Sequence, residues 1–104
     1  MPLPIHPKLK QNIDFVASIA EHLIKMGYEI KRWEGVISWI NNLHVNIWVY
    51  PIGGKWDNKM ELRIGTSQKM KALSNPLSKD VGKEVIPWIV QWLKWVEADQ
   101  TIPF

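Results

Sequence analysis

The gaps between the apolar segments of this chain are so short that they constrain the fold more than any other feature of its sequence. Three segments with strand character follow one another, at 28–33, 36–40 and 43–52. Only two residues separate each pair, Glu34-Gly35 and Asn41-Asn42. Gly and Asn accept the positive φ angles of tight hairpin turns, whereas parallel strands need crossovers of about a dozen residues or more. The sequence therefore predicts an antiparallel meander.

A fourth strand is expected at 59–65, after a longer connection at 53–58 that begins with two glycines. The second strand has an alternative, because "EGVISWINN" also suits a short helix. The predicted sheet therefore has three to four strands.

Two amphipathic helices flank these strands. The first is expected at 8–26, where an apolar stripe recurs at steps of three and four residues and Gly27 supplies a left-handed end. The stripe consists of Leu9, Ile13, Val16, Ala20, Leu23 and Ile24. The last helix is expected at 80–98, with Pro87 either kinking it or marking its first turn. The fold class is thus α+β, an antiparallel meander of three to four strands with an N-terminal and a C-terminal helix packed on one face.

The 104 residues fit a single domain, 1–104, with an extended Pro-rich tail at 1–7 and a mobile basic loop at 66–80. The chain has no cysteine, which excludes disulfides, cysteine-ligated metals and thiolate catalysis. The N-terminus lacks the apolar core of a signal peptide, and no apolar run approaches the ~20 residues that span a bilayer. We therefore expect a cytoplasmic protein without membrane contact.

Tryptophan is the most unusual part of the composition, with seven residues in the chain. Trp is large and carries an N–H group that needs a partner, so seven of them cannot all lie in one small core. The segment "HVNIWVY" (44–50) alternates between an apolar set and a set that includes Trp and Tyr. Alternation places the second set on the sheet face that the helices leave open. The candidate binding surface consists of Trp33, Trp39, His44, Trp48, Tyr50 and Arg63.

Three interpretations of that face stay open. Trp, Tyr and Arg are enriched where binding energy concentrates in protein interfaces. Exposed rings also stack on flat ligands or cations. Alternatively, the aromatic residues form cross-strand pairs that only stabilise the sheet.

The last helix carries apolar residues over more than half of its circumference, whereas a helix on one sheet needs a stripe of about 100° or a little more. Either the helix is wedged between the sheet and the first helix, or it contacts a second copy of the chain. The self-association candidates are Trp88, Trp92 and Trp95, and a symmetric homodimer is the expected assembly.

Positive charge is concentrated between Lys55 and Lys83, with seven basic and three acidic residues. The candidate anion or nucleic-acid residues are Lys55, Lys59, Lys69 and Lys71. One interpretation is a patch that neutralises phosphates. The alternative is a solvated lysine-rich loop whose charge only keeps the protein in solution.

No catalytic motif is visible. The three histidines, His6, His22 and His44, share no metal-binding spacing, and the chain has no nucleophile elbow and no phosphate-binding glycine loop. We therefore expect no enzyme, no metal and no cofactor. The sequence predicts a small non-enzymatic binding or adaptor domain that acts through its aromatic-rich surface and self-associates. The alternatives are nucleic-acid or anion binding through 55–83 and small-molecule binding in a Trp-lined pocket.

Overall fold

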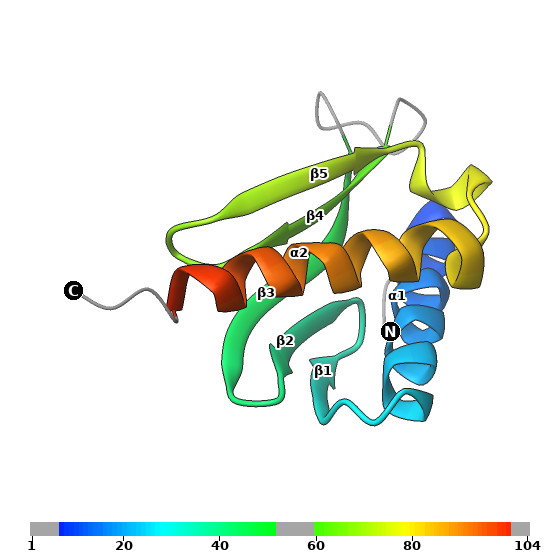
Figure 1. Ribbon diagram of the computed structural model, residues 1–104. Coiled ribbons are helices and arrows are strands. Elements are labelled where there is room, and N and C mark those ends of the chain that lie inside the picture. Colours follow the sequence, from blue (N-terminus) through cyan, green and yellow to red (C-terminus); the bar gives the residue numbers. More distant parts are fainter. Residues whose placement is uncertain (1–6, 52–59, 101–104) are drawn as a thin grey trace.

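The structure is a computed structural model that describes residues 7–51 and 60–100 (Figure 1). The elements follow in the order α1 (Pro7–Lys25), β1 (Ile30–Trp33), β2 (Val36–Ile40), β3 (Leu43–Pro51), β4 (Met60–Gly65), β5 (Met70–Ser74), η2 (Pro76–Ser78), η3 (Val81–Val85) and α2 (Ile86–Gln100). The extended tail predicted at 1–7 lies outside the described residues, apart from Pro7 at the start of α1. No helix in the described ranges is long and apolar enough to cross a membrane.

The strands form one antiparallel sheet in the order β1-β2-β3-β4-β5, so the predicted α+β class and the meander are confirmed. Residues 36–40 form a strand, so the helical alternative for this segment is wrong. The turns before and after it use left-handed residues, Glu34 at φ 48 and Asn41 at φ 54. Such turns bring consecutive strands into register without a longer loop.

The strand count is higher than predicted, because β5 lies in the segment at 66–80 that we expected to be a mobile basic loop. Thr66 closes the β4–β5 turn. Its backbone N–H donates to the carbonyl of Lys69 at 2.8 Å, and its hydroxyl accepts from the N–H of Lys69 at 3.1 Å. This short hydroxyl-stabilised turn pairs β5 with β4 through all five β5 residues.

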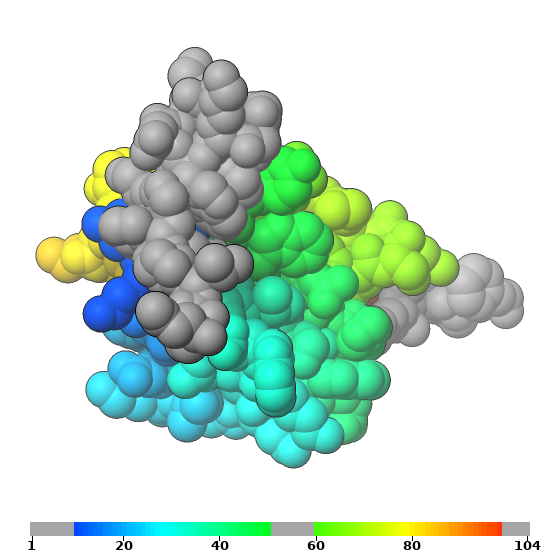
Figure 2. Space-filling model, turned by 180° about the vertical axis from the view of Figure 1, so that it is seen from behind, coloured from blue at the N-terminus to red at the C-terminus, as the bar shows by residue number. Residues whose placement is uncertain are grey.

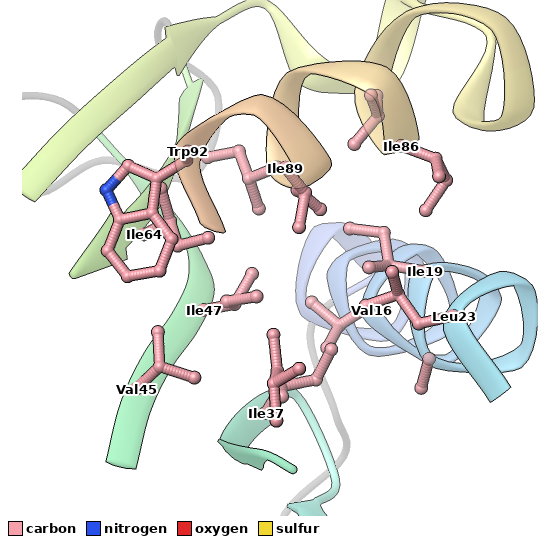
Figure 3. Close-up of a cluster of buried hydrophobic side chains, with 14 of the residues drawn as sticks. Val16, Ile19, Leu23, Ile37, Val45, Ile47, Ile64, Ile86, Ile89 and Trp92 are labelled. Atoms are coloured by element: carbon pink, nitrogen blue, oxygen red, sulfur yellow. The ribbon is translucent and has the colours of Figure 1, made fainter. Parts of the chain in front are cut away.

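One face of the sheet joins both helices in a common core (Figure 3). Val16, Ile19 and Leu23 of α1 share this core with Ile37 and Ile47 of the sheet, and α2 adds a second row of apolar side chains. Ile24, which the sequence placed on the α1 stripe, is exposed, because it lies about 100° around the helix from buried Leu23. The two helices are placed differently on this face. The helix α1 contacts β1, β2 and β3, whereas α2 crosses in front of the sheet in the view of Figure 1.

The start of α2 differs from the predicted bounds of 80–98. Residues Val81–Val85 form a π-helical turn, and the α-helix begins at Ile86. Pro87 supplies the physical reason: it has no N–H, and its ring would clash with the carbonyl four residues earlier in a continuous α-helix. Asp80 caps the turn, since its carboxylate accepts from the N–H of Lys83 at 2.9 Å, and its own N–H donates to Glu84 at 2.8 Å.

Candidate functional site

The sheet face opposite the core carries the aromatic side chains that the alternation predicted. Along β3, Val45, Ile47 and Val49 are buried, while the residues between them are exposed or half-buried. We call this side the outer face; it comprises Lys31, Trp33, Trp39, His44, Asn46, Trp48, Tyr50, Glu61, Arg63, Met70, Ala72 and Ser74. Figure 2 shows the molecule from behind the view of Figure 1, where side chains of β1, β2 and β3 form much of the surface.

Trp39 and His44 form a pair on the outer face. They are cross-strand neighbours in the β2–β3 register, and their ring centroids lie 4.8 Å apart at 45°. Trp39 remains 38% exposed and His44 is also exposed. The pair therefore stabilises the β2–β3 hairpin and still presents a large aromatic surface to solvent.

Arg63 and Tyr50 form a second cluster, on β4 and β3. The guanidinium of Arg63 lies 3.9 Å from the centre of the Tyr50 ring, and its Nε donates to the Glu61 carboxylate. The charge of Arg63 is thus offset by Glu61, while its flat face covers Tyr50. This part of the outer face offers planar aromatic and guanidinium groups with little net charge.

Trp33 is the most exposed large apolar residue of the described chain, with 80% of its surface accessible. It borders a groove of about 300 Å³ between the β1–β2 turn, the first half of α1 and β3. The groove is lined by Asn12, Ile13, Trp33, Glu34, Gly35, Val36, Trp48 and Val49. Most of these side chains are apolar, and two tryptophans form part of the wall.

Gly35 allows the β1–β2 turn to approach α1 closely. A Cβ atom on Gly35 would lie 3.3 Å from Cγ1 of Ile13, which is tighter than an ordinary van der Waals contact. The turn therefore packs directly against the helix and fixes one side of the groove.

Asn12 is the buried polar residue of this region. It is 4% exposed, and among the described residues neither its Oδ1 nor its Nδ2 has a hydrogen-bond partner. A buried amide without partners costs about 1–3 kcal/mol. Sequence reasoning missed Asn12, but its spacing contains a signal. It lies four residues before Val16 and seven before Ile19, so helical periodicity places it on the buried side of α1.

The three tryptophans proposed for self-association have different environments. Trp92 is 1% exposed in the core, so it cannot contact a second copy of the folded chain. This corrects its inclusion among the surface candidates. Its Nε1 has no hydrogen-bond partner among the described residues. Trp88 is half-buried against the core, and Trp95 is 40% exposed. The wide apolar surface of α2 is therefore largely used within the monomer.

The two candidate lysines that the structure describes, Lys69 and Lys71, lie apart from the aromatic surface. Lys55 and Lys59 lie outside the described residues. The Nζ atoms of Lys69 and Lys71 lie 4.0 and 4.9 Å from the centre of the Trp95 ring, on α2. Lys71 is paired with Ile64, so its side chain lies on the core side of the sheet. The structure thus separates these two lysines from the outer-face rings.

In the described part of the chain, no three His, Asp or Glu side chains lie close enough to hold a metal ion. Comparisons with protein-family models, with curated proteins and with solved structures find no match for the chain.

Proposed function

We propose that the protein is a non-enzymatic binding domain whose outer face contacts a protein partner. The observation that carries this proposal is the exposure of Trp33, Trp39 and Tyr50 on the side of the sheet that faces away from the core. Trp, Tyr, Met and Arg are enriched at the centres of protein interfaces, where large side chains lose contact with water.

The chemistry of the face favours an apolar or aromatic segment of a protein over a nucleic acid. Arg63 is paired with Glu61, so it offers a phosphate little unbalanced charge. The groove beside Trp33 and Trp48 has the size of one or two side chains and a mostly apolar lining. A partner that inserts an apolar side chain there would cover the surface of Trp33.

The composition without cysteine supports action in the reducing cytoplasm. We propose this location together with the binding role.

The test is a comparison of proteins captured from an extract of the source cells by the wild-type chain and by variants. The variant Trp33→Ser/Tyr50→Ser removes two exposed rings from the binding surface. Trp95→Ser is the matched control, because it removes a Trp of 40% exposure from α2, on the other side of the sheet. We expect to find at least one protein that the wild type and Trp95→Ser capture and that the double variant does not capture. Equal retention by all three would refute the role of the outer face.

A second candidate is a small ligand in the groove, which Asn12 favours. Its amide, which has no hydrogen-bond partner in the described part of the chain, lies beside an apolar wall, and pockets for small molecules combine such walls with few polar groups. A flat aromatic amide matches both features. In a thermal-shift assay, benzamide should raise the unfolding temperature of the wild type and leave that of Asn12→Leu unchanged. No shift with the wild type would count against this ligand class.

A further inference from the structure

The two edges of the sheet differ in regularity. β1 has four residues and its pairing with β2 is interrupted between Lys31 and Arg32. β5 has five residues, which pair with β4 without interruption. A bulged, short edge resists pairing with another strand, whereas a regular one is a template for it. The β5 edge is therefore the one suited to sheet extension.

The hydrogen bonds at both ends of β5 define which backbone groups point outward. Thr66 donates to Lys69 at one end, and Asn75 donates to the carbonyl of Met60 at the other. In an antiparallel ladder, residue pairs that are hydrogen-bonded to each other alternate with pairs whose backbone N–H and C=O groups point away from the partner strand. The N–H and C=O groups of Met70, Ala72 and Ser74 consequently point away from β4.

These three residues are open to solvent. Met70 is 60% exposed, and Ala72 and Ser74 are exposed as well. No described residue pairs with their outward backbone groups. Edge strands are often protected by charges, but Lys71, the charged residue of β5, lies toward Trp95 on the core side of the sheet. The outer-face side of this edge carries no charge.

We propose that β5 pairs antiparallel with β5 of a second copy, across a two-fold axis at Ala72, and so joins two sheets into one. In this register Ala72 lies opposite Ala72 of the second copy, and Met70 lies opposite Ser74. All three outward residues then form hydrogen-bonded pairs, which is the self-complementarity that a two-fold interface requires.

The side chains support a second copy as the occupant. Lys71 lies opposite Leu73 of the second copy, so the register places no like charges directly across from each other. On the outer face, the small Ala72 lies at the axis, and the exposed Met70 gains a neighbour in Ser74. This contact uses the edge of the sheet and leaves the rings of Trp33, Trp39 and Tyr50 free, so it stands or fails separately from the proposed function.

Disulfide trapping tests this register, because the chain contains no cysteine of its own. In Ala72→Cys the two Cα atoms lie about 5.5 Å apart across the axis, within the range of about 4.4–6.8 Å that a disulfide spans. In Met70→Cys, on the same strand and face, the two Cα atoms lie about 14 Å apart, because they are offset by four residues of about 3.4 Å. Met70→Cys is therefore the matched control for chance collisions.

We expect Ala72→Cys to form the covalent dimer at least about tenfold faster than Met70→Cys under mild oxidation, since pairing raises the local thiol concentration. Adding Ser74→Pro to Ala72→Cys removes one outward N–H without a loss from the β4 ladder, and should reduce the rate to that of the control. Circular dichroism and thermal unfolding verify that each variant is folded. Equal rates for the two cysteine variants, or a rate that Ser74→Pro leaves unchanged, would overturn the proposal.

Discussion

Replacement of Asn12 by Leu should stabilise the protein. Asn12 is 4% exposed and its two amide atoms make no hydrogen bond within 7–51 and 60–100, so folding removes them from water without compensation from these residues. Burying a polar group without a hydrogen bond costs about 1–3 kcal/mol of folding free energy. Leu has a similar branched shape without polar atoms, so it avoids this cost. The groove of about 300 Å³ beside residue 12 gives the larger methyl groups room. We therefore expect a gain of about 2 kcal/mol in the free energy of unfolding.

Urea unfolding followed by tryptophan fluorescence measures this gain directly. With an unfolding entropy of about 2.1 cal/mol/K per residue, 2 kcal/mol corresponds to a rise of about 9 °C in Tm for a chain of this length. Gln11→Leu is the control, since Gln11 is the exposed neighbour on α1 and its replacement should change stability by no more than about 0.5 kcal/mol. A lower stability of Asn12→Leu would show that the amide is bonded in the folded protein and would refute this reasoning.

Three further predictions concern stability and are checked by the same unfolding measurement. Asp80→Ala should cost about 1 kcal/mol, because it removes the cap of the π-helical turn, whereas exposed Asp14→Ala should cost little. Glu34→Gly should stabilise by about 1 kcal/mol, because Glu34 has a left-handed backbone at φ 48; an unchanged or lower stability would contradict this. Gly65→Ala should destabilise by about 1–3 kcal/mol, because its Cβ would lie 2.6 Å from Cγ of Met70. The double variant Gly65→Ala/Met70→Ala should recover part of that stability. If its loss equals the sum of the losses of the two single variants, the contact between residues 65 and 70 is not the cause.

The local signals in the sequence were sufficient for α1 and for β1 to β4. Two-residue gaps and left-handed Asn41 define hairpins without any long-range information. The alternation at 44–50 also predicted which side chains of β3 are buried, since Val45, Ile47 and Val49 all belong to the core. These patterns are short-range, because each hairpin pairs two strands that are neighbours in the sequence.

β5 could not be predicted from its own residues. The segment "MKALS" contains no β-branched or aromatic residue, and most of it is exposed. It becomes a strand because the Thr66 turn returns the chain along β4, which supplies the backbone partners. Tertiary pairing outweighs intrinsic preference here.

The candidate site was predicted in part. The positions of Trp39, His44 and Tyr50 on the outer face follow from alternation, but the groove beside Trp33 does not. It forms where Gly35 approaches α1 closely, and its lining brings together Asn12, Gly35 and Trp48, which are far apart in the sequence. Likewise, the burial of Trp92 depends on how α2 crosses the sheet, which periodicity alone leaves open.

The proposed function requires that the outer face of the sheet contacts the partner. It is tested most directly by the indole N–H signals of the tryptophans in a ¹⁵N NMR spectrum, recorded while a protein captured by the wild-type chain is added. We expect the signals of Trp33, Trp39 and Trp48 to shift or broaden and those of Trp88, Trp92 and Trp95 to keep their positions. Changes confined to Trp88 and Trp95, with Trp33 and Trp39 unaffected, would contradict it.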